Sequence, residues 1–471
     1  MKLIRYCILP LVLSITASAQ KKPSYTPDQA VARMKLPAGF SVTQFAAEPD
    51  VVQPFAFCFD DRGRVWVCEN LNYETRKSDS FKQGPKGRIL ILEDTDGDGR
   101  FDMRKVFIEK IFFPTGLQVG FGGVWVGSPP NLLFIPDKNG DDVPDADPTV
   151  VLDGWGRQDR HETLNSFVWG PDGWLYGLHG VFTHSKVGKP GTPDKDREPL
   201  NAGVWRYHPT KKKFEVFAWG TSNPWGLDFD SRGQAFITAC VIPHLWHMIQ
   251  GGRYHRQGGR HFNRHVYNDI KTIADHVHQN YGGRKHEDGL AYFYANGAFS
   301  EKNNRQRKGG FAHGGCQIYN GGAFPKQYHG QAFMGNIHHH MLYVDNLKRR
   351  GSGFAGTHGG DFMLAHDQHF LGFNLDTGPA GALWVIDWND ADICGRIVHQ
   401  LGTGRIGETQ HHAGLQGIVL GKGVAGEMLH ILLVVLPERL GGFQENAATI
   451  TGLETTNGIF KARHVLSVER Q

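Results

Sequence analysis

The stretch SFVWGPDGWLYGLHG, residues 166–180, decides the fold. Two short runs of apolar and aromatic residues, 166–169 and 174–178, flank a Gly-Pro-Asp-Gly turn. Strand-forming side chains on both sides of such a turn predict a β-hairpin. The chain continues with GVWRYHP at 203–209, the turn TKKK, and FEVFAWG at 214–220. The region therefore predicts four strands that run back and forth.

A glycine followed closely by an aromatic residue recurs in five further apolar runs. The six aromatic residues are Trp66, Trp125, Tyr176, Phe236, Phe333 and Trp384. In the second copy the glycine, Gly123, lies one residue nearer to its tryptophan. A period of 50 to 60 residues with several short strands per repeat is typical of β-propellers. The six copies predict an all-β, six-bladed propeller, with one long insertion at about 241–311 on the loop-rich face.

Composition and the N-terminus limit the class of protein. The chain has 471 residues, of which 40% are hydrophobic and 21% charged, and a net charge of +4, which is ordinary for a globular protein and gives no excess for binding nucleic acid. Lys2 and Arg5 precede an apolar run at 6–15 and an Ala-Ser-Ala cleavage site at 17–19. This pattern predicts a signal peptide at 1–19 and a periplasmic or secreted protein. No later segment approaches the ~20 apolar residues of a membrane span.

Five cysteines follow the predicted signal peptide, and none of them forms a CxxC motif, so covalent c-type haem is excluded. Cys58 and Cys68 flank one predicted hairpin. They could form a disulfide across it, or both could be buried free thiols.

Two acidic turns raise the question of a bound cation. The first holds Asp94, Asp96, Asp98 and Asp102, and the second holds Asp137, Asn139, Asp141 and Asp145. Positions 1, 3, 5 and 9 of a glycine-kinked loop can supply the oxygen ligands that Ca²⁺ prefers. Solvated turns are the alternative, because the equivalent turn of the third unit is Lys211–Lys213. Both turns link the third and fourth strands of a unit, so they belong to the tight-turn face.

The histidines are expected on the opposite, loop-rich face, where function usually concentrates. His161, next to Glu162, directly precedes the third unit and can act as a general base or as a hydrogen-bonded loop residue. His276 and His278 alternate after Asp275 and could ligate a transition metal. For His244 and His247, a packing or hydrogen-bonding role is preferred.

Three stretches resemble the soluble quinoprotein glucose/sorbosone dehydrogenases. They are the run from His161 through GPDGWLY, SNPWGLDFDSRGQAF at 222–236, and IYNGGAFPKQYHGQAFMGN at 318–336. With VIPHLWH, TIADHVH and the DTDGDG turn, the chain is most similar to the bacterial membrane-bound dehydrogenase domain group. The resemblance covers about residues 36–405.

The resemblance implies an enzyme that oxidises a sugar or polyol with pyrroloquinoline quinone (PQQ) and passes electrons to a separate carrier, such as a cytochrome c. It makes His161 the catalytic base and Glu162, Asn165, His179 and Asn223 candidate pocket residues. It also implies basic residues that hold the PQQ carboxylates, and here the sequence departs from the pattern: Ser222 stands where the family has arginine.

The propeller is expected to span 36–406, after a linker at 20–35 and before an atypical tail at 407–471. The last blade is expected to lack a strand unless the segment at 40–49 closes it. Two other functions stay open. The protein could be a non-catalytic propeller that binds carbohydrate or protein, or a metal-dependent lactonase-type hydrolase with an ion in its central channel.

Overall fold

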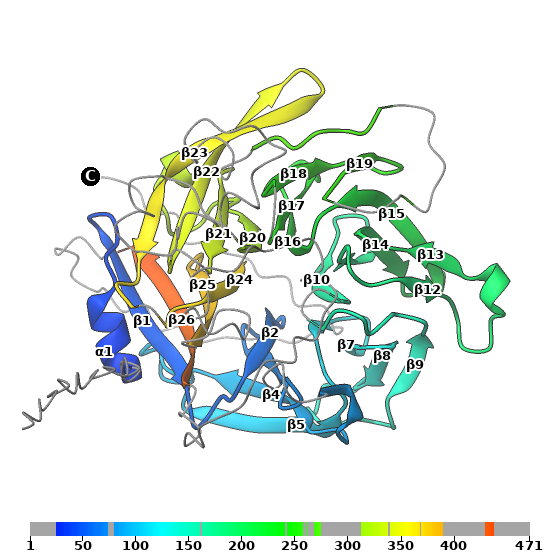
Figure 1. Ribbon diagram of the computed structural model, residues 1–471. Coiled ribbons are helices and arrows are strands. Elements are labelled where there is room, and N and C mark those ends of the chain that lie inside the picture. Colours follow the sequence, from blue (N-terminus) through cyan, green and yellow to red (C-terminus); the bar gives the residue numbers. More distant parts are fainter. Residues whose placement is uncertain are drawn as a thin grey trace, which may run out of the picture. The chain divides into compact units, whose positions relative to one another are not determined.

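A computed structural model describes residues 25–73, 80–160, 163–240, 243–257, 261, 268–274, 312–337, 340–367, 369–389 and 429–437. Met1–Glu438 form one compact unit, and Arg439–Gln471 form a second unit outside these residues. Six sheets follow one another along the first unit (Figure 1). The predicted six-bladed, all-β propeller is confirmed.

The first three blades are antiparallel sheets, apart from one parallel strand at the edge of blade three. Blade one contains β2 (Pro54–Phe59), β3 (Val65–Glu69), β4 (Gly87–Glu93) and β5 (Met103–Ile111). Blade two contains β6 (Gly116–Val119), β7 (Gly123–Ser128), β8 (Asn131–Pro136) and β9 (Thr149–Leu152). Blade three contains β10 (Asn165–Trp169), β11 (Leu175–His179), β14 (Gly203–His208), β15 (Lys213–Thr221) and, as a fifth strand, β19 (Arg253–Arg256).

The remaining blades follow the same order from the inner strand outward. Blade four contains β16 (Pro224–Phe229), β17 (Ala235–Ala239) and β18 (Leu245–Met248). Blade five contains β20 (His313–Ile318), β21 (Ala332–Asn336), β22 (Met341–Arg350) and β23 (Gly353–Leu364). Blade six contains β24 (Gly372–Thr377), β25 (Leu383–Asn389), β26 (Leu429–Pro437) and β1 (Phe40–Ala47). A hairpin of β12 (Ser185–Val187) and β13 (Glu198–Leu200) lies outside these sheets. The helix α1 (Pro27–Arg33) precedes β1, and no described helix is long and apolar enough to cross a membrane.

The first and the last described strands of the propeller pair with each other and close the ring. Each inner strand contacts the next, from β2 through β6, β10, β16, β20 and β24 and back to β2. In blade six, β26 pairs with β25 and β1 pairs with β26, with Val42 opposite Val435. The segment at 40–49 therefore closes the last blade as expected. The third strand of that blade comes from the segment that the sequence assigned to the tail.

The recurring aromatic residues lie on the second strand of each blade and form much of the packing between blades. Trp125 packs edge-on against Trp169 of blade three, with ring centroids 6.1 Å apart. Tyr176 contacts Phe229 of blade four at 5.1 Å, and Phe236 contacts Phe354 of blade five at 4.9 Å. Such large aromatic rings dominate the buried area between sheets.

The recurring glycine has a conformational reason. It occupies the turn between the first two strands with φ values of 73° to 81°, a left-handed conformation that favours glycine. In blade two this position belongs to Gly122, with φ 79°, and not to Gly123. The spacing of three residues to the aromatic side chain is therefore the same in all six blades.

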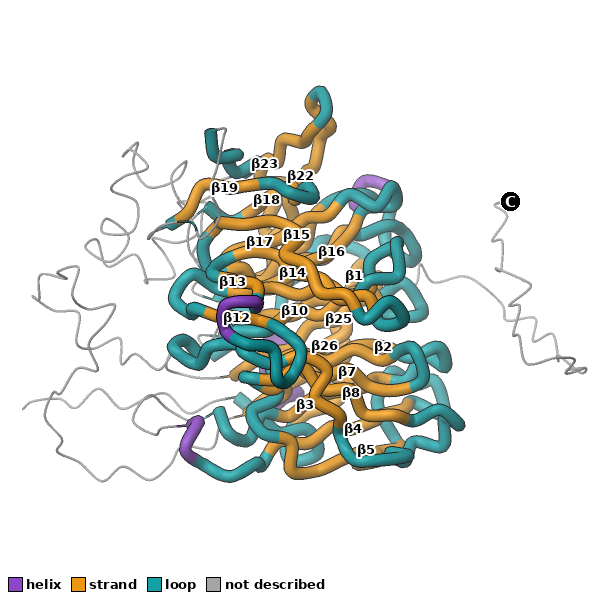
Figure 2. Tube along the Cα trace, turned by 90° about the vertical axis from the view of Figure 1, so that its right-hand side faces the viewer, coloured by secondary structure: helices purple, strands orange, loops and turns teal. Residues whose placement is uncertain are grey.

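Two details of the sequence interpretation are decided by the structure. The segment 241–311 contains β18, the third strand of blade four, and β19, which pairs in parallel with β15 of blade three. Of the two alternatives for Cys58 and Cys68, the buried free thiols are confirmed, and Cys58 lies opposite Trp66 while Cys68 lies opposite Ala56. The turns between strands lie on either side of the strand layer, where Figure 2 shows them in teal.

Candidate functional site

The described pocket residues predicted from the sequence lie at the loop-rich ends of neighbouring strands. Asn165 begins β10, His179 ends β11, and Asn223 directly precedes β16. All three are buried, and the loops that carry them are joined where Val181 N donates to Asn223 Oδ1 at 2.9 Å. His161 and Glu162 lie outside the described residues, immediately before this corner in the chain.

His179 is fixed by a chain of hydrogen bonds that determines its tautomer. Its Nδ1 donates to Gly180 O at 2.9 Å, because a carbonyl can only accept. Its Nε2 then accepts from Ser185 Oγ at 2.7 Å, and Ser185 Oγ accepts from Gly156 N at 2.8 Å. Burial lowers the pKa of His179 to about 4, so the ring is neutral near pH 7. With both nitrogens engaged, His179 positions the loop that follows β11.

Asn165 lies between two residues with a strained backbone, and its side-chain amide has an unused donor. Leu164 and Ser166, on either side of it, have left-handed φ values of 53° and 56°, and the pairing of β10 with β11 is irregular here. Asn165 Oδ1 accepts from Ser166 Oγ at 2.7 Å, whereas its buried Nδ2 has no hydrogen-bond partner. Strain and buried unsatisfied groups both cost free energy and are often retained at functional sites.

The same combination occurs at the end of β15, where the resemblance expects an arginine. Thr221 has a left-handed φ of 77°, which is unusual for a β-branched residue, and its buried Oγ1 has no hydrogen-bond partner. The Ser222 hydroxyl accepts from the backbone nitrogen of Asn223. Ser222 is fully buried and serves the local turn.

A guanidinium group nevertheless lies beside this turn, on β19. Arg256 is opposite Thr221 in the parallel pairing of β15 with β19, and it is 8% exposed. It donates to Asn201 O at 2.6 Å, and Asn201 Nδ2 donates to Val181 O and Thr183 O, both at 2.7 Å. Sequence reasoning missed this arginine because it is 34 positions beyond Ser222 and reaches the site only through the fifth strand.

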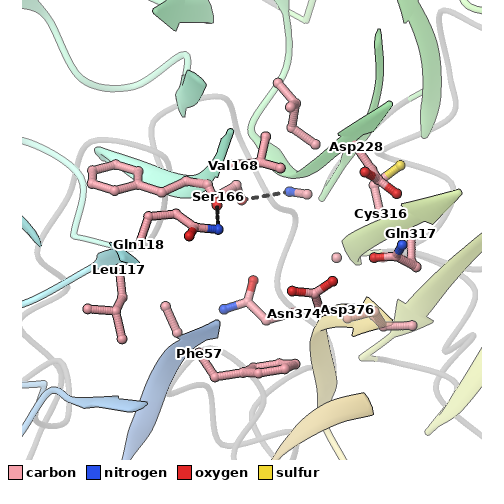
Figure 3. A pocket seen from close by; sticks show the side chains of 16 residues that line it. Phe57, Leu117, Gln118, Ser166, Val168, Asp228, Cys316, Gln317, Asn374 and Asp376 are labelled. Atoms are coloured by element: carbon pink, nitrogen blue, oxygen red, sulfur yellow. Dashed lines mark hydrogen bonds between the residues drawn. The ribbon is translucent and has the colours of Figure 1, made fainter. Parts of the chain in front are cut away.

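A small cavity lies between the inner strands of all six blades (Figure 3). Its volume is about 70 Å³, which is room for a few water molecules. Figure 3 shows the side chains of Gln118, Asp228, Gln317, Asn374 and Asp376 around this space. A sugar or a tricyclic quinone is too large for it, so such a ligand would have to bind outside the cavity.

Two carboxyl groups in this cavity were not predicted. Burial raises the pKa of Asp228 to about 8 and that of Asp376 to about 7. Asp228 accepts from Phe229 N and Ile318 N, both at 2.7 Å, whereas Asp376 accepts from Thr377 N at 2.7 Å. The available signal was a Leu-Asp pair inside an inner strand, at 227–228 and again at 375–376.

The first acidic turn joins β4 to β5, as predicted. Among the described residues, ligand oxygens of Asp94, Asp96 and Asp102 lie within 4.8 Å of one another, an arrangement that could hold a metal ion. The same turn is also stabilised by its own backbone, since Gly97 N and Gly99 N donate to Asp94 at 2.7 and 2.9 Å. Asp98 lies outside the cluster and accepts from Arg100 N at 2.7 Å.

The negative charge of the second acidic turn, between β8 and β9, is partly balanced by basic side chains of blade one. Asp142 forms a bidentate pair with Arg64 at 2.7 and 2.8 Å, and Lys105 Nζ donates to Asp141 O at 2.8 Å. Its polar side chains also serve the turn. Asp137 accepts from Gly140 N, Asp145 accepts from Lys138 N, and Asn139 donates to Asp141. The charge that suggested a cation site is partly neutralised here by protein side chains.

The described histidines of blades four and five have structural partners. His244 Nε2 lies 2.8 Å from Asp345 Oδ2, and neither side chain is exposed. The His244 ring is also 4.5 Å from that of His313, measured between centroids. His247 Nε2 lies 3.0 Å from Gln234 Oε1. These contacts agree with the preferred hydrogen-bonding role. His276 and His278 lie outside the described residues.

Comparison with known families places residues 26–395 in one of them. These residues match the family described as Domain of unknown function (DUF7133). The chain belongs to this family. No curated protein matches the sequence.

Solved structures with a similar fold include two sugar dehydrogenases. The soluble aldose sugar dehydrogenase from Escherichia coli, in its apo form, is 13% identical with a TM-score of 0.48, over 85% of this chain and 100% of that one. The PQQ-bound aldose sugar dehydrogenase from Streptomyces coelicolor is 14% identical with a TM-score of 0.44, over 85% and 100%. Neither likeness decides the activity, which has to be argued from the residues.

Proposed function

We propose that the protein is an exported quinoprotein-type dehydrogenase that oxidises a sugar or polyol and passes electrons to a separate carrier, such as a cytochrome c. The observation that carries the proposal is a pair of buried, unsatisfied polar atoms at the loop-rich ends of blade three, the blade that follows His161 in the chain. Asn165 Nδ2 and Thr221 Oγ1 both lie there without a partner. Such atoms on the loop face of a rigid scaffold are typical of a ligand site.

The donor set at this corner fits a polycarboxylate cofactor. PQQ needs cationic groups for its carboxylates, and Arg256 lies beside Thr221 although Ser222 replaces the expected arginine. When bound, PQQ supplies the hydride acceptor. We assign to His161 the removal of the substrate hydroxyl proton, with Glu162 and Asn223 as polar neighbours. Asn165 offers its free Nδ2, and His179 holds the loop after β11 in place.

Titration of the purified protein with PQQ in the presence of calcium tests this function. We expect saturable binding, seen in the absorbance spectrum, that raises the melting temperature. His161→Ala should keep the binding but lose oxidation of the sugars that the wild type accepts. His208→Ala, at the end of β14 next to a tight turn, is the matched control. Absence of PQQ binding by normally folded protein would remove the PQQ mechanism.

Calcium has a structural role in this proposal. Asp94, Asp96 and Asp102 offer the best oxygen cluster of the two acidic turns, and this turn lies on the face opposite the proposed active site. Chelation should therefore lower the melting temperature without PQQ as well as with it.

A second candidate function rests on Asp228 and Asp376. Two carboxyl groups from different inner strands could contribute to a divalent ion of a lactonase-type hydrolase, but Asn374 is already engaged with Trp225 and Phe55. Lactone hydrolysis that depends on added Mn²⁺, Zn²⁺ or Ca²⁺ and is lost in Asp376→Asn would favour this function. If both assays fail, a non-catalytic propeller that binds carbohydrate or protein is the remaining proposal.

A further inference from the structure

The outer edge of blade three carries a group of polar side chains that the proposed function does not use. We call Arg253, His261 and Asp269 the β19 cluster. β19 lies beside β15 at the outer edge of blade three (Figure 1), and Arg253, the first residue of β19, is opposite Trp219. Ile270 N donates to Arg253 O at 2.9 Å, and Tyr254 forms a parallel bridge with Ile270. This pairing brings Asp269 next to Arg253.

One carboxylate is shared by the two basic side chains of the β19 cluster. Asp269 Oδ1 lies 3.2 Å from Arg253 Nε, and Asp269 Oδ2 lies 3.4 Å from His261 Nε2. The His261 side chain is only 7% exposed and the Arg253 side chain 18%. The contacts are thus long and largely shielded from water.

Two buried nitrogens of the cluster have no hydrogen-bond partner. They are Nη1 of Arg253 and Nδ1 of His261, whereas Arg253 Nε and His261 Nε2 face the Asp269 carboxylate. Leaving a buried polar group unsatisfied costs about 1–3 kcal/mol, and more if the group is charged. Two such atoms on side chains that share one carboxylate point to a ligand that completes their hydrogen bonds.

The electrostatic field around the cluster is positive. Burial lowers the pKa of His261, and the charges of Arg253 and Arg256 also lower it, whereas Asp269 raises it. Burial also lowers the pKa of Arg256 to about 10, and there the charge of Arg253 has a larger effect than the charge of Asp269. The two guanidinium groups therefore outweigh the single carboxylate, and a monoanion would restore the balance.

His261 lines a groove of about 950 Å³, which is in the size range of small-molecule sites. The groove is formed mainly by the end of blade two and the β12–β13 hairpin, and its lining includes Asn131, Asp153, His184, Lys186, Asp194 and Arg197. The two acidic residues in the lining are already matched: Asp194 pairs with Lys186 at 3.1 Å, and Asp153 pairs with Arg197. Asn131 offers an amide group that suits hydroxyls.

We propose that the β19 cluster binds the carboxylate of a polyhydroxy acid, such as a sugar acid, that lies in this groove. The carboxylate would accept hydrogen bonds from Arg253, and Nδ1 of the neutral His261 ring, whose Nε2 faces Asp269, would accept one from a hydroxyl of the ligand. Asp269 limits the charge of the ligand. Its carboxylate balances one of the two guanidinium charges, so one negative charge of a ligand can be balanced, and a dianion such as hydrogen phosphate is repelled. This binding does not depend on PQQ or on the proposed oxidation.

Melting temperature and calorimetric titration without PQQ test the site with four probes: glucuronate, gluconate, glucose and inorganic phosphate. We expect saturable binding of glucuronate or gluconate and none of glucose. Arg253→Gln should weaken this binding by at least about tenfold, since it removes charge-assisted hydrogen bonds. Arg232→Gln, an exposed arginine in the turn between β16 and β17, should leave it unchanged.

Asp269→Asn provides a test in the opposite direction, should Arg253→Gln fail to fold. Removing the competing carboxylate should tighten the binding of sugar acids and admit phosphate. Equal responses to glucose and glucuronate, unchanged affinity in Arg253→Gln, weaker binding in Asp269→Asn, or a wild-type preference for phosphate would each overturn the proposal.

Discussion

At the scale of single residues, burial decides whether a histidine can change its charge near neutral pH. The pKa of His179 falls from an ordinary 6.5 to about 4, so folding favours its neutral form. Its contribution to stability is complete above pH 6.5 and is lost as the pH falls through about 4, with a size of roughly 3 kcal/mol. We expect His179→Gln to flatten this part of the curve of unfolding free energy against pH, measured by urea denaturation. The same slope in both proteins would contradict the assignment.

Asp376 predicts the opposite dependence on pH. Its pKa is raised from 3.8 to about 7, so its contribution is present below pH 4 and is lost as the pH rises through 7. Asp376→Asn keeps the acceptor for Thr377 N and removes the buried charge. The variant should therefore melt at a higher temperature than the wild type at pH 8, but not at pH 4. Asp61→Asn, at an exposed turn, controls for the change in net charge; a similar gain there would count against burial as the cause.

At the scale of one element, the glycine turn before the second strand of each blade allows two costs to be measured separately. These are the strain of a left-handed backbone and the steric clash of an added Cβ. Gly173 and Gly381 have φ values of 77° and 74°, but an added Cβ meets nothing within 4 Å at Gly173 and lies 2.5 Å from Ala323 N at Gly381. Gly173→Ala should cost about 1 kcal/mol, from the left-handed backbone alone. Gly381→Ala should cost about 2 kcal/mol more, from the clash. Equal losses in chemical denaturation would show that the turn relaxes.

The same elements show what the sequence could and could not predict. The six glycine–aromatic turns are local patterns, and each determined the position of one blade. Arg256 could not be assigned in this way, because its place beside Thr221 results from a parallel pairing between segments separated by the three strands of blade four. The departure from the family pattern at Ser222 stays a prediction. The roles of His179, Asp228 and Asp376 depend on burial, which local sequence does not reveal.

At the scale of the whole propeller, closure depends on pairing between the two ends of the ring. β26 is hydrogen-bonded to β25 on one side and to β1 on the other, so its removal leaves two edges unpaired and disconnects the N-terminal strand from blade six. A chain that ends after residue 428 should lose at least about 10 °C in melting temperature, or the cooperative transition itself. A chain that ends after residue 438 keeps β26 and lacks only the second unit, so it should melt within a few degrees of the full chain. Scanning calorimetry of the three chains decides between the two explanations: equal losses in both truncations would mean that the second unit, and not the pairing of β26, stabilises the ring.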